Sequence, residues 1–202
     1  MINHIEHSAF VELYNKDSNI FARLFNDTKL LNTLINKIQK ESKNWEKFNY
    51  KDENKMMGDL FEIFSECFFK ILGADNRIGV CGYTPEKSSE DCGVDAFGTG
   101  MDNKPLTVQV KFRSNNETEL VSDDIKQFAF QSVKKYKVDI DTRTNMVVFT
   151  SANGLNWFTD KNVFVESLRT IGFKEIRTLV DNNICFWNMV RDYVVETIKT
   201  KY

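Results

Sequence analysis

A short set of polar residues around one predicted hairpin has the chemistry needed to hold a divalent cation against a phosphate ester. The segment Asp-Cys-Gly-Val-Asp occupies residues 91–95 at one strand, and Gln-Val-Lys occupies residues 109–111 on the next. Because alternate residues of a strand share a face, Gln109 and Lys111 point the same way. If the two strands pair, the carboxylate of Asp95 meets an amide and an ammonium at one place. This combination predicts a Mg²⁺ site that acts on a phosphodiester.

Each residue of this set also has a common structural explanation. An aspartate at a strand end often forms a turn, and a lysine on an edge strand often prevents aggregation. The second strand is otherwise apolar, however, with Val108, Val110 and Phe112 on the face opposite Gln109 and Lys111. A polar face on so apolar a strand favours a functional site.

A further acidic residue, Glu62, lies in the segment Gly-Asp-Leu-Phe-Glu at residues 58–62, inside a predicted apolar helix. A glutamate on a helix is often only a solvated surface group. Together with Asp-x-Gly-Val-Asp and Val-Gln-Val-Lys, in this order and spacing, the segment resembles the Mrr-like restriction endonucleases of the PD-(D/E)xK nuclease superfamily. The resemblance runs from residue 58 to a predicted helix at 122–137 and includes a later strand at 146–150, about half of the chain.

The resemblance implies a role for each matching residue. Asp95 takes the place of the family's metal-binding aspartate, and the helix glutamate falls on Glu62. Gln109 stands where the wider superfamily has glutamate, which removes one negative charge, and the backbone carbonyl of Val110 is a further ligand. Lys111 would orient or activate the attacking water and stabilise the transition state. Asp91 has a supporting role, and Mg²⁺ is the expected metal, with Mn²⁺ able to replace it.

The function that the resemblance implies is a metal-dependent DNA endonuclease, with a homodimer as a plausible assembly. Polar and basic residues that follow the lysine strand would contact the DNA backbone, although a solvated helix face has the same composition. These residues are Lys126, Gln127, Gln131 and Lys134.

Two other functions are consistent with the sequence. One is a nuclease-derived DNA-binding module within a larger DNA-processing assembly, with weak catalysis because Gln109 replaces a carboxylate. The other is a structural α/β protein in which Asp95, Gln109 and Lys111 do not converge.

Composition narrows the class of protein. The chain has 202 residues, 42% of them apolar, and a net charge of −2, which does not by itself indicate a nucleic-acid-binding protein. Its four cysteines form no CxxC pair and it has only two histidines, so a zinc site is not expected. The sequence shows no signal peptide or membrane-spanning run, which predicts a cytoplasmic protein. Heavy use of Lys, Asn, Ile and Phe is typical of an AT-rich genome and suggests a bacterial or phage origin.

The predicted elements describe an α/β fold with a central mixed sheet flanked by helices, and the resemblance implies that this fold is of restriction-endonuclease type. An N-terminal helical extension covers residues 1–54 and the nuclease-like domain 55–202. Asp27 or Thr28 is the expected N-cap of the second N-terminal helix. The later elements are a helix at 55–72, strands at 77–83, 93–98 and 106–113, a helix at 122–137, a strand at 146–150, a helix at 159–172, a strand at 174–180 and a helix at 186–199.

Overall fold

The computed structural model of the protein describes residues 4–87, 93–139, 145–156 and 168–201. The chain divides into a helical unit, Met1–Ile71 with Glu175–Tyr202, and a sheet unit, Leu72–Lys174. The predicted boundary between residues 54 and 55 falls inside the helical unit. None of the helices in the described ranges is both long and apolar enough to cross a membrane.

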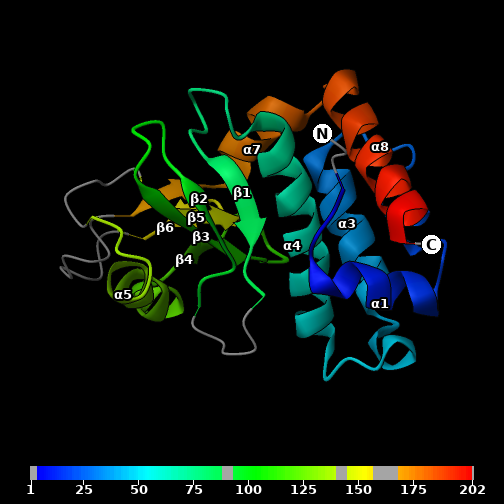
Figure 1. Ribbon diagram of the computed structural model, residues 1–202. Coiled ribbons are helices and arrows are strands. Elements are labelled where there is room, and N and C mark those ends of the chain that lie inside the picture. The colour runs from blue at the N-terminus through cyan, green and yellow to red at the C-terminus, as the bar shows by residue number, and fades with distance from the viewer. Residues whose placement is uncertain (1–3, 88–92, 140–144, 157–167, 202) are drawn as a thin grey trace. The chain divides into compact units, whose positions relative to one another are not determined.

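The helical unit is built around a long helix, α4, whose apolar side chains face in several directions. Within α4, Leu60, Phe61, Ile63 and Phe64 are all buried. The ring of Phe64 lies 6.0 Å from that of Trp187 on the last helix. Figure 1 shows the other helices of the unit gathered beside α4. The helices are α1 (Ser8–Lys16), α2 (Ile20–Phe25), α3 (Leu31–Ser42), the 3₁₀ helix η1 (Trp45–Phe48), α4 (Glu53–Leu72), α7 (Phe173–Val180) and α8 (Ile184–Lys201).

The start of α3 differs from the prediction. Asp27 adopts a left-handed backbone with φ of 57°, and the Thr28 hydroxyl donates to the carbonyl of Leu24 at 2.6 Å. Neither residue caps α3. The amide of Leu31 has no acceptor within the helix and donates instead to Oδ1 of Asp181 at 2.8 Å. A residue distant in the sequence therefore supplies the acceptor for this amide of the first turn.

The strand predicted at 174–180 is wrong, because this segment is helix α7. Phe173, Ile176 and Val180 are buried, and their spacing places all three on one helical face. Of the helix predicted at 159–172, residues 159–167 lie outside the described residues. Its end is not helical, since Arg169–Ile171 forms strand β7.

The sheet unit contains a mixed five-stranded sheet in the order β1-β2-β3-β5-β7. Neighbours β1, β2 and β3 are antiparallel, whereas β5 is parallel to both β3 and β7. The fold is therefore α/β with a central mixed sheet, as predicted. The strands are β1 (Cys81–Pro85), β2 (Ala96–Thr99), β3 (Pro105–Lys111), β5 (Met146–Thr150) and β7 (Arg169–Ile171), with a small parallel pair formed by β4 (Glu119–Leu120) and β6 (Gly154–Leu155).

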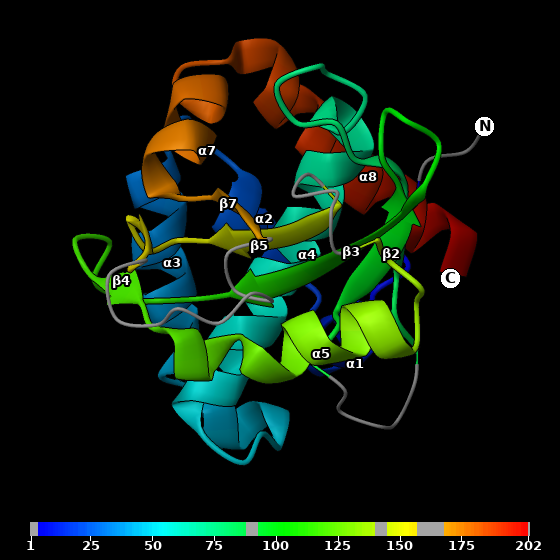
Figure 2. The same cartoon turned by 90° about the vertical axis from the view of Figure 1, so that its left-hand side faces the viewer.

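Helix α5 (Lys126–Lys134), preceded by the 3₁₀ helix η2 (Ser122–Asp124), lies along one face of this sheet (Figure 2). The predicted helix at 122–137 is thus confirmed in shorter form. Phe128 and Ala129 of α5 are fully buried in one core with Met146 and Val148 of β5. This packing fixes α5 against the middle of the sheet, beside β3.

Candidate functional site

Strand β3 presents a polar face to α5. The hydroxyl of Thr107 donates to that of Ser132 on α5 at 2.7 Å, which shows the direction of the Thr107 side chain. Because side chains alternate along a strand, Gln109 and Lys111 lie on the same face as Thr107. The predicted common face of Gln109 and Lys111 is therefore present.

Asp95 is held next to β3 by its backbone and its side chain. Its amide donates to the carbonyl of Val108 at 3.0 Å, and its carbonyl accepts from the amide of Glu86 at 2.8 Å. Its Oδ2 accepts from the amide of Val110 at 2.6 Å. Asp95 is half-buried, and its carboxylate is thus bound to Val110, the residue between Gln109 and Lys111.

The side-chain oxygen of Gln109 is buried and has no hydrogen-bond partner in the described part of the chain. Gln109 itself is only 3% exposed. A buried amide oxygen without a donor carries an uncompensated desolvation cost, which a bound cation or an ordered water would offset. This orphaned oxygen fits the predicted role of Gln109 as a metal ligand.

The carbonyl of Val110 faces the side on which Asp95 lies. The amide of Thr107 donates to the carbonyl of Asn145, just before β5. The carbonyl of Val108, in contrast, accepts from the amide of Asp95 on the other side of β3. Peptide groups of alternate residues face opposite neighbours, so Val110 shares the direction of Val108. Three oxygen donors, from Asp95, Gln109 and Val110, therefore come from adjacent positions, as oxygen-preferring cations require.

Lys111 is half-buried, and within the described residues its ammonium has neither a hydrogen-bond nor an ion-pair partner. Its backbone is firmly held, however. The carbonyl of Lys111 accepts from the Thr150 hydroxyl at 2.8 Å and the Ser151 amide at 3.3 Å. The Ser151 hydroxyl in turn bonds both backbone groups of Arg113. The end of β3 is fixed while the ammonium keeps its charge available.

Gly93 allows α5 to approach the Gln109 amide. Its φ is +72°, a left-handed conformation that a glycine adopts without steric cost. A Cβ at this position would lie 3.3 Å from the amide nitrogen of Phe128 and 3.4 Å from Nε2 of Gln109. The glycine of the Asp-x-Gly-Val-Asp segment is thus required by both its backbone and its surroundings. Asp91, the first residue of that segment, lies outside the described residues.

No family model matches the chain, and no curated protein matches it either. The interpretation of the site therefore depends on the geometry around β3.

Glu62 belongs to α4 of the helical unit, whereas Asp95 belongs to the sheet unit. The Oε2 atom of Glu62 lies 2.8 Å from Nε2 of His7. Its place among the ligands around Asp95 stays a prediction.

The residues predicted to contact DNA lie on α5. Lys126, Gln127 and Lys134 are exposed, and Gln131 is half-buried. Lys126 forms a 2.7 Å ion pair with Asp123. The helix therefore presents cations and amides to solvent, which suits both a phosphate contact and a plain solvated face.

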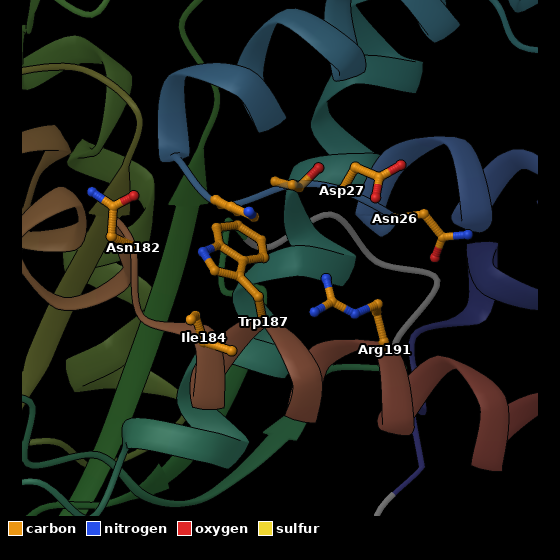
Figure 3. Close-up of a pocket in the computed structure, with 8 residues that line it drawn as sticks. Asn26, Asp27, Asn182, Ile184, Trp187 and Arg191 are labelled. Carbon is orange, nitrogen blue, oxygen red and sulfur yellow. The ribbon is translucent and has the colours of Figure 1, made fainter.

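A separate cavity of about 340 Å³ lies in the helical unit, and none of the predicted site residues lines it. Figure 3 shows the indole of Trp187 in its wall, with the guanidinium of Arg191 nearby. These groups are already bonded, since Trp187 donates to the carbonyl of Val180 and Arg191 to that of Phe25. None of the unpartnered buried side-chain atoms of the described residues belongs to this lining, so the cavity indicates no ligand.

Proposed function

We propose that the protein is a metal-dependent DNA endonuclease of restriction-endonuclease-like fold, with its site at the end of β3. The observation that carries this proposal is the place of Asp95. Its carboxylate bonds the amide of Val110, between the orphaned oxygen of Gln109 and the unpaired ammonium of Lys111. A carboxylate, an amide oxygen and an ammonium without a partner among the described residues are groups that the hydrolysis of a phosphodiester can use.

The donor set fits Mg²⁺, with Mn²⁺ as a replacement. Asp95, Gln109 and Val110 offer only oxygen atoms, and small hard cations prefer oxygen ligands while retaining several waters. When bound, such an ion acidifies a coordinated water and neutralises charge on the phosphate. Because Gln109 supplies no charge, Asp95 provides the one carboxylate among these three donors.

Lys111 supplies a positive charge at the end of β3, beside the proposed metal ligands. Its ammonium can donate to the attacking water and to a non-bridging phosphate oxygen, where negative charge grows in the transition state. The water oxygen forms a bond to phosphorus as the bond to the leaving sugar oxygen breaks. The attacking water gives one proton to solvent, and the leaving oxygen takes one proton from solvent. The hydrogen bonds that Thr150 and Ser151 make to the Lys111 carbonyl keep the lysine backbone from moving during these steps.

DNA is the proposed substrate because α5 carries exposed Lys126 and Lys134, with Gln127 beside them, on the helix that covers the face of Gln109. Such side chains bind phosphates without reading the base sequence. Cleavage of both strands would follow most simply from a homodimer, which we include in the proposal.

The test is cleavage of supercoiled plasmid by purified protein with Mg²⁺ or with EDTA. We expect Mg²⁺-dependent nicking or linearisation that Lys111→Ala and Asp95→Asn abolish. Asp95→Asn is informative because an amide oxygen can still accept from Val110 while the charge is lost. Lys104→Ala is the matched control, since Lys104 is exposed at the opposite end of β3. Absence of cleavage by the natural protein, or full activity in Lys111→Ala, would contradict the proposal.

A second candidate function is a nuclease-fold DNA-binding module with weak catalysis, and the amide at Gln109 favours it. In that case the protein binds DNA in Mg²⁺ without cutting it, and binding does not require Lys111. Glu62→Gln tests the predicted role of Glu62, since a metal ligand is lost without a change of size.

A further inference from the structure

The helical unit contains a second group of metal-ligand side chains, formed by His7, Asp59 and Glu62. Each offers one ligand atom, and these atoms all lie within 4.8 Å of one another. We propose that this group binds a divalent transition-metal ion of the Zn²⁺ type, as a site separate from the Mg²⁺ ligands on β3. The inference does not depend on nuclease activity.

The two carboxylates share one face of α4, because Asp59 and Glu62 are three residues apart. His7 comes from the segment that leads into α1, 55 positions before Glu62. In Figure 1 this segment runs alongside α4. The Nε2 atom of His7 lies 2.8 Å from Oε2 of Glu62, which joins the imidazole to the two carboxylates of α4.

Buried Glu66 fixes the position of His7. Its carboxylate is 0% exposed and accepts from the amides of Glu6 at 2.6 Å and His7 at 2.9 Å. Lys70 neutralises it at 2.7 Å. The imidazole is thus attached to α4 through its backbone as well as its ring, which preorganises the group for a ligand.

The field at the imidazole attracts cations. The carboxylate of Glu62 lies 2.8 Å from the His7 ring, and the carboxylates of Asp59 and Glu66 are close by, so the charges around the imidazole are mainly negative. The ammonium of Lys55 would compete with a metal ion for Asp59, since it forms an ion pair with Oδ1 of Asp59 at 2.8 Å. The Lys55 side chain is 62% exposed and can return to water when a metal ion takes its place.

Tyr50 provides an independent observation. Its hydroxyl oxygen is buried and has no hydrogen-bond partner in the described part of the chain. The hydroxyl lies beside the carboxylate of Asp59, one of the proposed ligands, without forming a hydrogen bond of normal geometry. A water bound to the metal ion would give this hydroxyl the partner that it lacks.

The ligand types decide which metal is expected. One imidazole and two carboxylates suit Zn²⁺ and neighbouring transition metals, and three protein ligands leave a position open for water. Mg²⁺ prefers oxygen alone, so it should not compete effectively. Besides the displacement of Lys55 and the loss of the bond between His7 and Glu62, binding has a further cost. With Nε2 on the metal, the ring proton moves to Nδ1, and the long 3.3 Å hydrogen bond from the amide of Ala9 is lost.

The experiment titrates untagged, metal-free, full-length protein with Zn²⁺ by calorimetry and with Co²⁺ by absorption spectroscopy. We expect one ion bound per chain, with excess Mg²⁺ present, and a fall in affinity of at least about tenfold in His7→Ala and Glu62→Gln. Lys55→Ala should raise the affinity because it removes the competing ammonium. NMR of the imidazole nitrogens should show the proton of His7 on Nδ1 in the Zn²⁺ form.

His4→Ala is the matched control, since it removes the other histidine, and Asp95→Asn tests independence from the site on β3. Both should bind Zn²⁺ as the natural protein does. If His7→Ala does not fold, the near-isosteric Asp59→Asn and Glu62→Gln carry the test. Failure of the natural protein to bind Zn²⁺ or Co²⁺, or equal binding by the Asp59 and Glu62 variants, would overturn the inference. Plasmid cleavage that survives in His7→Ala would leave the nuclease proposal intact and show that the two sites are independent.

Discussion

The carboxylate of Asp95 accepts a 2.6 Å hydrogen bond from the backbone amide of Val110. This bond attaches the acid to the residue that separates Gln109 from Lys111. The bond uses one oxygen of the carboxylate. The position of the acid therefore depends on backbone geometry and does not require a bound ion.

Mg²⁺ should stabilise the protein through Asp95. At a concentration about ten times its dissociation constant, a bound ion contributes roughly 1.4 kcal/mol, which raises the melting temperature by about 3–6 °C. Asp95→Ala should abolish this rise, because it removes the charged ligand of the three donors Asp95, Gln109 and Val110. Differential scanning calorimetry with and without Mg²⁺ measures the effect. Asp123→Ala, which removes an exposed acid, should keep it.

Gln109→Glu should strengthen metal binding. The substitution keeps the size of the side chain and places a second carboxylate beside Asp95, where its repulsion is relieved only by a cation. We expect a lower Mg²⁺ concentration for half-maximal plasmid cleavage and lower stability without metal. A variant with an unchanged Mg²⁺ dependence would show that Gln109 is not a ligand.

Gly93→Ala should destabilise the protein by about 1–2 kcal/mol, the usual cost of a left-handed backbone for an L-residue. The close approach of Phe128 adds to this cost. Gly58→Ala is the control, because a Cβ there meets nothing within 4 Å and alanine favours a helix by up to about 1 kcal/mol. Urea denaturation should therefore give changes of opposite sign for the two variants.

Asp181→Ala should weaken α3 by about 0.5–2 kcal/mol, because the Leu31 amide loses its cap. Asp181→Asn retains an oxygen acceptor at the same place but breaks the ion pair with Arg177. We expect this variant to be close to the natural protein in thermal denaturation. Equal destabilisation by both substitutions would assign the effect to the ion pair.

The pH dependence of stability should include a contribution from Asp17. Hydrogen bonds from Arg23 and then Lys47 hold its pKa well below the usual 3.8. A carboxylate with a lowered pKa stabilises the fold above its usual pKa, and this stabilisation is lost as the pH falls through the folded value. Asp17→Asn should therefore reduce the unfolding free energy at pH 6 by up to about 1 kcal/mol, the range of a surface ion pair. The difference from the natural protein should shrink below about pH 4 in urea titrations.

Much of the fold was predictable because it follows from local periodicity. The apolar face of α4 and the alternation along β3 depend on residues close in the sequence, so the helix and the shared face of Gln109 and Lys111 were both expected. Local patterns were ambiguous at 174–180, where short apolar spacing suits either a strand or a helix, and packing of Ile176 and Val180 decided for the helix.

Other features depend on residues that are distant in the sequence. The amide of Leu31 is capped by Asp181, 150 positions later, and no local pattern announces that partner. His7 reaches Glu62 because long-range hydrogen bonds, among them those to buried Glu66, hold the N-terminal segment against α4. The sequence by itself determined which residue types alternate on a strand or a helix, since this depends on backbone geometry alone. Only the tertiary structure decided that the side-chain oxygen of Gln109 is buried without a partner among the described residues and that His7 joins the acids, because burial and long-range hydrogen bonds are properties of the folded chain.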